Sequence, residues 1–378
     1  MRVVAVDRNP DAPGFAEADA GEVVDFHDVA AVIDVARAGR VDGVLTYAAE
    51  RAVPIVAAVA EALDLPGIGG EAAHLATHKL AQRRRLAERG VPQPEFAAAR
   101  NLHEGLAALE RVGVPAVLKP VDSAGQRGLF RLESEADLER HLHLALAESP
   151  TKEAIVERFH DGLEVNTLLV GRDGRPTLVT ASDRVRPEGR GFGVALTHLF
   201  PSTLFGAALE SVEWTASAAV RALGLRECVA YPQILSTQDT GALTVEVAAR
   251  IPGGQMSDVA LYGAGVDLVE VSLLQALGEP VPDDLVEPRQ TQPLAILFLT
   301  AQPGPLPTGR VKSVRGIDRL LGAPGVVQAD VYLTEGETIR PVQRDGDRRG
   351  YVVALGDTNL EALARARAAA ELLQVEVE

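Results

Sequence analysis

A carboxylate and an arginine stand close together in the segment TVEVAAR, and their spacing suits phosphate chemistry. Two β-rich runs, residues 229–235 and 243–247, flank the turn-forming tetrapeptide QDTG at residues 238–241. This pattern predicts a β-hairpin. When its loop is centred in the middle of the tetrapeptide, Gln233 on the first strand lies opposite Glu246 on the second.

Side chains alternate between the two faces of a strand, so Glu246, Ala248 and Arg250 share one face. The Glu246 carboxylate and the Gln233 amide oxygen are hard ligands of the kind that Mg²⁺ prefers. The Arg250 guanidinium can hold a phosphoryl group or a carboxylate. We interpret this face as a metal and phosphate site with Glu246 and Gln233 as the metal ligands. A surface salt bridge between Glu246 and Arg250 is the structural alternative.

A second group of residues begins at Lys119, which ends a predicted strand and precedes the loop SAGQRG. Gly125 and Gly128 allow the backbone to approach phosphate oxygens closely, and Ser123 and Gln126 add hydrogen-bond donors. The loop is not a P-loop, because no Gly-Lys-Ser/Thr sequence follows, and an ordinary β-turn is the alternative. We interpret it as a phosphate-binding loop.

Hydrophobic periodicity predicts the elements that must position these groups. Besides the hairpin, we expect strands at residues 3–6, 43–46, 114–119, 154–159, 164–170 and 177–181, and helices at 29–38, 53–63, 72–89, 102–112, 135–147, 209–223 and 360–373. The early β-α alternation indicates a doubly wound sheet. Its first strand runs into Asp7 without a glycine-rich turn, so we expect this domain to lack its first βα unit or to start upstream.

Turns and linkers divide the chain into four predicted domains. We place an N-terminal Rossmann-like domain at 1–93, a second segment at 94–160, a third segment with several strands at 161–283, and a C-terminal α+β domain at 284–378. The predicted fold class is therefore α/β and α+β.

Composition narrows the class of partner and the compartment. The 378 residues hold 37 Lys and Arg against 53 Asp and Glu, a net charge of -16, which disfavours nucleic acid and anionic membranes. The single cysteine, Cys228, excludes an internal disulfide and is expected to be a core residue. No apolar run is long enough to span a membrane, and the N-terminus lacks a secretory signal, so we expect a cytoplasmic protein.

The order of these motifs resembles the ATP-grasp superfamily over nearly the whole chain. The segments that carry the resemblance are DRNP (7–10), DGVL (42–45), LPGI (65–68), THK (77–79), GVPQP (90–94), VLKP (117–120), IVERF (155–159) and RGYVVALG (349–356). They are most similar to the branch that contains amino-acid ligases, which are carboxylate-amine ligases, and carbamoyl-phosphate synthases. The resemblance implies an ATP-grasp architecture, with a lid subdomain at 94–160 and a larger antiparallel-sheet subdomain with the metal site at 161–283. It also implies the cofactors ATP and Mg²⁺.

The resemblance also implies a role for each matching residue. Lys79 and Lys119 would contact the nucleotide phosphates, and the loop from Ser123 to Gly128 would cover them. The adenine edge would be read by Glu157 and by the backbone of Arg158 and Phe159, and the ribose by Glu164. At the reacting end, Glu246 would bridge two metal ions and Arg250 would steady an acyl-phosphate. Apart from the resemblance, Arg184 and His198 are further candidates, because they lie in or beside the glycine-rich stretch 186–193, which could close over the substrate. Solvated loop charges are the alternative for the charged residues of this stretch.

Two positions depart from the family's pattern. An acid is expected where Gln233 stands and an asparagine where Ala248 stands. One metal site thereby loses a charge and a ligand, so we expect weaker binding of the second Mg²⁺.

The favoured function is an ATP-dependent ligase that activates a carboxylate as an acyl-phosphate for attack by an amine, of the amino-acid or peptide ligase type. Such catalysis relies on positioning and charge neutralisation, so no side-chain nucleophile is needed. The alternatives are an ATP-dependent carboxylase or purine-pathway ligase, and a nucleotide-binding protein without turnover. The expected partners are small carboxylates and amines, and the resemblance implies a homodimer.

Overall fold

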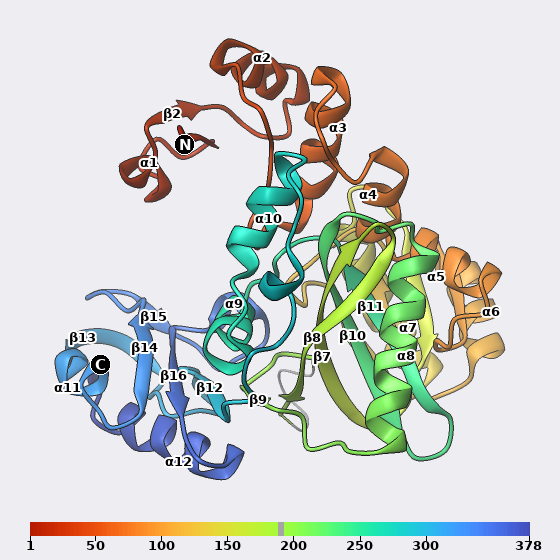
Figure 1. Ribbon diagram of the computed structural model, residues 1–378. Coiled ribbons are helices and arrows are strands. Elements are labelled where there is room, and N and C mark those ends of the chain that lie inside the picture. Colours follow the sequence, from red (N-terminus) through yellow and green to blue (C-terminus); the bar gives the residue numbers. More distant parts are fainter. Residues whose placement is uncertain (188–192) are drawn as a thin grey trace.

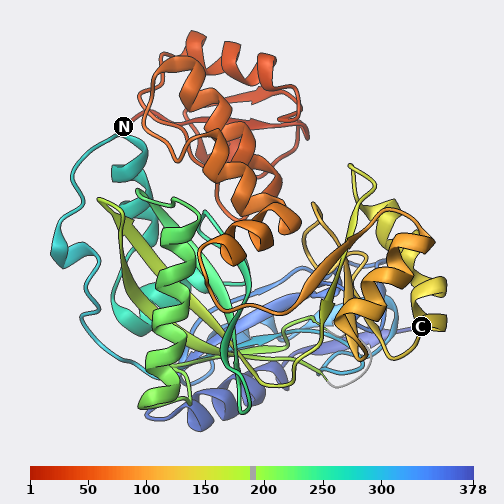
Figure 2. The same cartoon turned by 90° about the vertical axis from the view of Figure 1, so that its right-hand side faces the viewer.

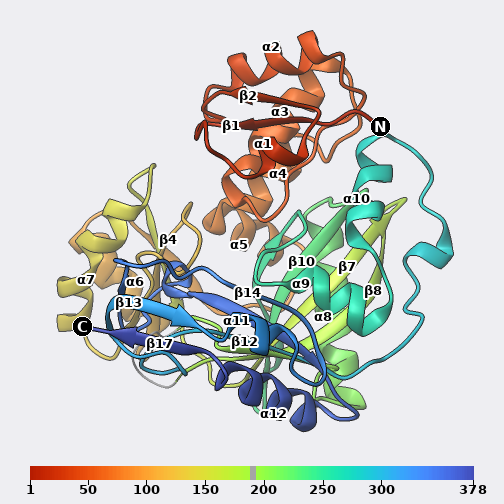
Figure 3. The ribbon, with the colours of Figure 1, turned by 90° about the vertical axis from the view of Figure 1, so that its left-hand side faces the viewer.

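The computed structural model of the chain describes residues 1–187 and 193–378, and most of the predicted loop 186–193 therefore lies outside the described residues. Four sheets organise the fold (Figure 1). In Figure 3 the N-terminal region stands at one end of the molecule, above the lid region and the largest sheet. In the described residues no single helix is long and apolar enough to cross a membrane. Only Met256–Ala264 and Leu268–Ala276 together, bent by 112° between them, pass that test, and both contribute to the buried core.

The N-terminal region is built on two parallel strands. Its elements are β1 (Val4–Asp7), α1 (Gly14–Glu17), β2 (Ala20–Val23), α2 (Val29–Gly39), the short 3-10 helix Glu50–Ala52, α3 (Val53–Leu63) and α4 (Gly70–Thr77). The strand predicted at 43–46 is wrong, and β2 was not predicted. Residues 43–46 make no ladder, because the chain leaves the small sheet, and Tyr47 instead forms an isolated parallel bridge with Ile251.

The single helix predicted at 72–89 is also wrong, because the structure has two helices, α4 and α5 (Lys79–Glu88). The break is at His78, whose φ of -119° and ψ of 102° are extended. The His78 ring accepts a hydrogen bond from the Ala81 amide and so caps α5. The Lys79 amide donates to the carbonyl of Val121 in the lid region, which directs Lys79 toward that region.

The lid region is a four-stranded antiparallel sheet with two helices. Its elements are β3 (Phe96–Ala99), α6 (Leu102–Val112), β4 (Ala116–Pro120), β5 (Phe130–Leu132), α7 (Glu135–Glu148) and β6 (Ala154–Arg158), with the strand order β3-β6-β4-β5. Asn101 and Ser134 cap the two helices through their side-chain oxygens. Figure 2 shows this region, in orange and yellow, beside the largest sheet.

The largest sheet has eight antiparallel strands in the order β11-β10-β7-β8-β9-β12-β16-β14. The strands are β7 (Leu163–Arg172), β8 (Arg175–Val185), β9 (Thr197–Phe200), β10 (Cys228–Thr237), β11 (Gly241–Ala248), β12 (Leu294–Phe298), β14 (Val326–Val331) and β16 (Gly350–Leu355). The prediction of a large antiparallel sheet is confirmed, although β7 and β8 are longer than predicted and β9 was missed. Strands on both sides of residue 283 belong to this one sheet. The domain boundary placed at that residue stays a prediction.

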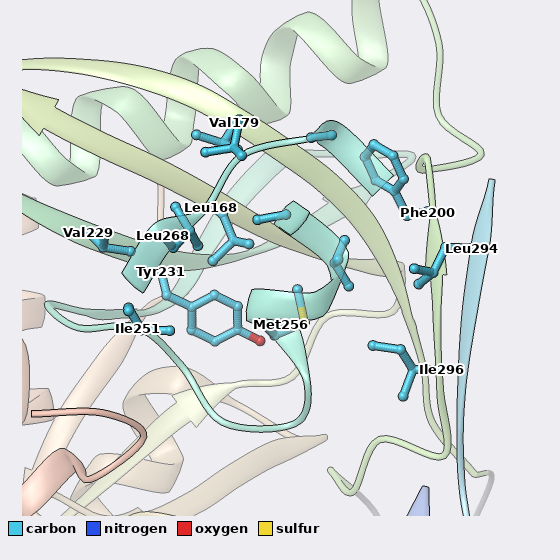
Figure 4. Packing of buried hydrophobic residues seen from close by; sticks show 14 of the residues in the cluster. Leu168, Val179, Phe200, Val229, Tyr231, Ile251, Met256, Leu268, Leu294 and Ile296 are labelled. Atoms are coloured by element: carbon cyan, nitrogen blue, oxygen red, sulfur yellow. The ribbon is translucent and has the colours of Figure 1, made fainter. Parts of the chain in front are cut away.

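Both faces of this sheet are buried, because alternate residues of β10 enter two different cores. Cys228 and Ala230 pack with α8 (Ala207–Ala222), whereas Val229 and Tyr231 pack with the helical segments after β11. Those segments are α9 (Met256–Asp258), the π-helical turn Val259–Ala264 and α10 (Leu268–Ala276). Figure 4 shows the second core, in which the Tyr231 ring lies among aliphatic side chains. Cys228 is a buried core residue, as predicted, and burial raises the pKa of its thiol to about 12.

The C-terminal segment adds strands to the large sheet and forms a small sheet of its own. The remaining elements are the 3-10 helices Asp283–Leu285 and Asp345–Asp347, β13 (Gly309–Arg315), α11 (Ile317–Leu321), β15 (Thr338–Ile339), α12 (Asn359–Ala370) and β17 (Gln374–Val377). The small sheet has the order β15-β13-β17. Helix α12 packs on β12 and β16 and closes the third core.

The hairpin of β10 and β11 pairs Gln233 with Glu246, as predicted, although its loop is offset from the predicted centre. Near the turn, Thr237 pairs with Gly241, which centres the loop on Asp239. The register then shifts by one residue after Gln233, so a β-bulge restores the predicted pairing at the site. The Thr237 hydroxyl stabilises the turn by accepting a hydrogen bond from the amide of Thr240.

Helix α5 covers the exposed edge of β11. The Gln82 side chain exchanges two hydrogen bonds of 2.9 Å with the backbone of Val247. The Arg83 guanidinium donates to the carbonyls of Thr244 at 2.6 Å and Val245 at 2.8 Å. These side chains pair backbone groups that an edge strand would otherwise expose.

We predict that Arg83→Met lowers the free energy of unfolding by about 3 kcal/mol, because the buried Glu157 carboxylate keeps only Lys119 as a partner and two backbone carbonyls of β11 lose a donor. Arg84→Met, an exposed position on the same helix, is the matched control and should change stability by less than about 0.5 kcal/mol. Urea unfolding of both variants measures the difference. Equal effects would contradict a stabilising role for Arg83.

Candidate active site

Two adjoining cavities bring together nearly all the residues that the sequence marked. The first is lined by Lys79, Lys119, Ser123, Gly125, Gln126, Glu157, Arg158, Phe159 and Glu164. The second contains His198 and Arg250. Both contain Arg184, Gln233 and Glu246, so these three residues stand where the cavities meet. The roles of the individual residues stay predictions.

The loop from Ser123 to Gly128 has open space and an unused donor, and its role as a phosphate-binding loop stays a prediction. Gly125 has a φ of +70°, and no atom lies within 4 Å of the position that a Cβ would take. The Ser123 hydroxyl is buried without a hydrogen-bond partner, although its carbonyl accepts from the Lys79 ammonium at 2.7 Å. Gly128 lies outside both cavities, and a Cβ there would come within 2.8 Å of Pro120.

A buried ion network anchors the floor of the first cavity. The Glu157 carboxylate contacts Arg83 Nε at 2.8 Å and Lys119 Nζ at 2.7 Å, and its side chain is only 5% exposed. Burial by itself would raise the pKa of Glu157, but Arg83 and Lys119 lower it to about 2. The carboxylate is therefore ionised and committed to two cations. It holds Lys119 in place, and its predicted contact with adenine stays a prediction.

We predict that ionised Glu157 stabilises the folded chain by about 3 kcal/mol at neutral pH. Its folded pKa is depressed, so this contribution is present above the ordinary value of 4.5 and is lost as the pH falls from there toward 2. Urea unfolding of the wild type and Glu157→Gln should show a stability gap at about pH 7 that narrows below about pH 4.5. A gap that is constant with pH would contradict the assignment.

The backbone of Arg158 and Phe159, which is predicted to read adenine, already uses its two amides in hydrogen bonds. The Arg158 amide donates to the Glu95 carbonyl at 2.9 Å, and the Phe159 amide donates to the Pro115 carbonyl at 3.0 Å. Within the described residues, the next amide, that of His160, has no such backbone partner, and His160 also lines the first cavity. The His160 amide is thus better placed to donate to a base than the amides of Arg158 and Phe159.

Glu164, the predicted ribose ligand, is held by two arginines. Its Oε2 accepts from Arg184 Nη1 at 2.6 Å, and its Oε1 lies 3.2 Å from Arg186 Nη1. Arg184 also donates to the carbonyl of Gly193. Because β7 pairs with β8, Glu164 and Arg184 are cross-strand partners, a spacing that sequence alone did not reveal.

The junction of the cavities suits a metal ion that a nucleotide carries. Glu246 lies 3.0 Å from Lys79 Nζ, whereas Arg250 pairs with Glu50. The described residues therefore do not show the salt bridge between Glu246 and Arg250 that was the structural alternative. No cluster of three or more His, Cys, Asp or Glu side chains that could hold a metal occurs in the described residues. Mg²⁺ commonly takes one or two carboxylates plus phosphate oxygens and water, so Glu246 and Gln233 fit such an ion.

A buried chain of hydrogen bonds joins this junction to the second cavity. Gln233 Nε2 donates to the Tyr231 hydroxyl at 3.1 Å, which donates to Asn166 Oδ1 at 2.6 Å. Asn166 Nδ2 then contacts His198 Nδ1 at 3.0 Å. Because Nε2 of Gln233 is committed to Tyr231, the amide oxygen Oε1 is left for another partner. This hydrogen bond therefore favours the orientation of the Gln233 amide in which its oxygen is available as a ligand.

The same series of hydrogen bonds, together with burial, sets the protonation of the His198 ring. Burial, with Arg184 and Arg348 nearby, lowers the pKa of His198 well below its ordinary value, so the ring is neutral. Its Nδ1 accepts from Asn166, which leaves the proton on Nε2. Nε2 lies 3.6 Å from the position that a Cβ on Gly254 would take. His198 is thus a neutral hydrogen-bond donor beside the glycine turn after Arg250.

Charged groups from both ends of the chain complete the second cavity. Arg250 Nε donates to Glu50 Oε2 at 2.7 Å, and Glu50 comes from the N-terminal region. Arg348 lies 3.9 Å over the Phe298 ring and donates to the carbonyl of Ala195 at 3.0 Å. The cavity is therefore rich in guanidinium groups, which suits an anionic substrate.

Sequence reasoning missed several residues that organise the site. Arg83 follows Lys79 by four positions and so shares its helix face, a signal that was present in the sequence. Asn166 follows Glu164 by two positions and so shares its strand face. Tyr231 likewise precedes Gln233 by two positions on one strand face. Glu50 carried no local signal, because its contact with Arg250 joins segments distant in sequence.

This geometry defines an ATP-grasp fold, in which a lid sheet and a larger antiparallel sheet face a nucleotide cavity. Residues 78–283 match the family model described as carbamoyl-phosphate synthase L chain, ATP binding domain. The chain belongs to this family, which confirms the predicted superfamily and ATP binding. Residues 302–378 match the model of the L-amino acid ligase C-terminal domain 2.

Similar proteins agree on the fold. The solved structure of an L-amino acid ligase from Bacillus licheniformis superposes with a TM-score of 0.86 at 22% identity, covering 100% of this chain and 93% of that one. A formate-dependent phosphoribosylglycinamide formyltransferase from Ignicoccus hospitalis is 28% identical over 399 residues, covering 99% of this chain and 90% of that protein. The uncharacterized protein y4rH of Sinorhizobium fredii is 28% identical over 325 residues, which are 84% of this chain but less than two thirds, 65%, of that protein.

Proposed function

We propose that this protein is an ATP-dependent ligase that joins the carboxylate of an amino acid to an amine through an acyl-phosphate. The observation that carries the proposal is the junction of the two cavities, where Glu246 and Gln233 separate a nucleotide cavity from one that contains Arg250. The match of residues 302–378 to an L-amino acid ligase domain supports an amino acid as the acyl donor. Family membership supports an enzyme over a nucleotide-binding protein without turnover.

The residues at the junction serve phosphoryl transfer by positioning and charge neutralisation. The Arg250 guanidinium would hold the substrate carboxylate, and Lys79 and the loop around Gly125 would hold the phosphates. The His198 Nε2 proton would face an oxygen of the substrate. Glu246 and Gln233 would hold Mg²⁺, which neutralises phosphate charge when bound. The products of this half-reaction are ADP and an acyl-phosphate.

The proposal predicts release of ADP and phosphate when the enzyme receives MgATP with suitable amino acids, and a product with the mass of an amide. A screen over single and paired amino acids, with bicarbonate and formate as separate arms, measures this release. Release with bicarbonate alone would support a carboxylase. Release that requires formate would support a formate-activating enzyme like the Ignicoccus hospitalis relative. No release in any arm would contradict an enzyme.

We predict that Gln233→Ala raises the Mg²⁺ concentration for half-maximal turnover by about 10-fold, because the chain loses an oxygen ligand. Tyr231→Phe should shift it in the same direction by less, since it only frees the Gln233 amide to rotate. Gln233→Glu should lower the requirement by adding charge. Magnesium titration of ADP release checks all three, and an unchanged requirement in Gln233→Ala would exclude Gln233 as a ligand.

A homodimer, implied by the family resemblance, stays a prediction. The substrates are small molecules.

A further inference from the structure

Glu50 is a largely buried carboxylate, and only one of its two oxygens has a hydrogen-bond partner. Its Oε2 accepts from Arg250 Nε at 2.7 Å and lies 2.5 Å from Arg250 Nη2. Its Oε1 is buried and has no hydrogen-bond partner, and the side chain is 12% exposed. A buried carboxylate oxygen without a partner is costly, so this position favours a ligand that can donate to it.

The fold brings Glu50 into the second cavity by a specific contact. Tyr47 bridges Ile251, and the amide of Ala48 donates to the Ile251 carbonyl at 3.0 Å. This attaches the N-terminal region next to Arg250. Glu50 thereby lines the same cavity as Arg250, Gly253 and Gly254.

The proposed reaction needs a group that this position can supply. An amino acid arrives with its amine protonated, whereas only the neutral amine can attack an acyl-phosphate. The cations of the cavity, including Arg184, Arg250 and Arg348, repel an ammonium group. An ionised carboxylate beside Arg250 would offset that repulsion and place the amine beside the carbon that reacts.

Resting on the proposed function, we propose that Glu50 is the catalytic residue that receives the amine substrate: its Oε1 binds the incoming ammonium group and accepts one of its protons. The C–N bond then forms as the neutral amine attacks the acyl carbon, and the C–O bond to phosphate breaks. The second proton leaves the nitrogen in the tetrahedral intermediate and departs with the phosphate. No oxidant or further reactant is needed.

The charged groups around Glu50 are compatible with this role. Arg250 and Lys79 stabilise its ionised form, whereas Glu246 opposes it. Burial is the largest effect, and it raises the pKa of Glu50 above the ordinary value. A raised pKa makes the carboxylate a better proton acceptor, while Arg250 by itself lowers the pKa and favours the ionised form.

Hydroxylamine separates this role from a structural one. It is largely neutral near pH 7, so it traps an acyl-phosphate as a hydroxamate without a base. We expect Glu50→Gln to keep hydroxamate formation with ATP and the acid substrate within about 2-fold of the wild type, and to lose about 10²- to 10⁴-fold in ligation of the amino-acid amine. Raising the pH should partly restore ligation, because more of the amine is then neutral.

The other outcomes overturn the proposal. If Glu50→Gln loses hydroxamate formation and ligation equally, Glu50 serves only to hold Arg250; if both are unchanged, it has no role in the reaction. Glu17→Gln, an exposed acid in the same region, is the matched control and should match the wild type in both assays. If the wild type forms neither hydroxamate nor ADP, the proposed function fails first, and the role of Glu50 fails with it.

Discussion

The ion network of Arg83, Glu157 and Lys119 is the interaction on which the site depends. Arg83 reaches from α5 to the lid carboxylate and to two carbonyls of β11, so one side chain joins three parts of the fold. Separating these parts would leave a buried charge unpaired, which costs several kcal/mol of folding free energy. This penalty favours one arrangement of the three parts. Lys119 and the hairpin with Glu246 are then fixed relative to each other, as phosphate transfer requires.

Periodicity and motif order predicted much of this arrangement from the sequence. The alternation along β11 placed Glu246 and Arg250 on one face, and both line the second cavity. The Gln233 to Glu246 pairing was correct, although the loop centre was offset by half a residue, because a bulge restored the register. Local sequence signals are sufficient to place a residue where its position depends only on a strand face or on a hairpin turn.

What the sequence could not predict depends on contacts between distant segments. The helix break at His78 arises because the Lys79 amide donates to Val121 in the lid region, a contact that no local propensity encodes. The pairing of Glu157 with Arg83 likewise joins residues that lie far apart in sequence, so motif order alone could not predict it. Residues 43–46 look like a strand, but a strand also needs a neighbour to pair with, and none lies beside them in the described chain.

The charge arrangement of the first cavity explains how an acidic protein can bind a nucleotide. The cations Lys79, Lys119 and Arg184 are each paired with a carboxylate, those of Glu246, Glu157 and Glu164 respectively. Pairing holds these cations in place within a chain of net charge -16 and prevents their mutual repulsion. A nucleotide phosphate would then share or replace a carboxylate as a partner, rather than order a flexible lysine. Glu246 is the carboxylate that such an exchange would free, at the point where the two cavities meet and a cation carried by the nucleotide would need a ligand.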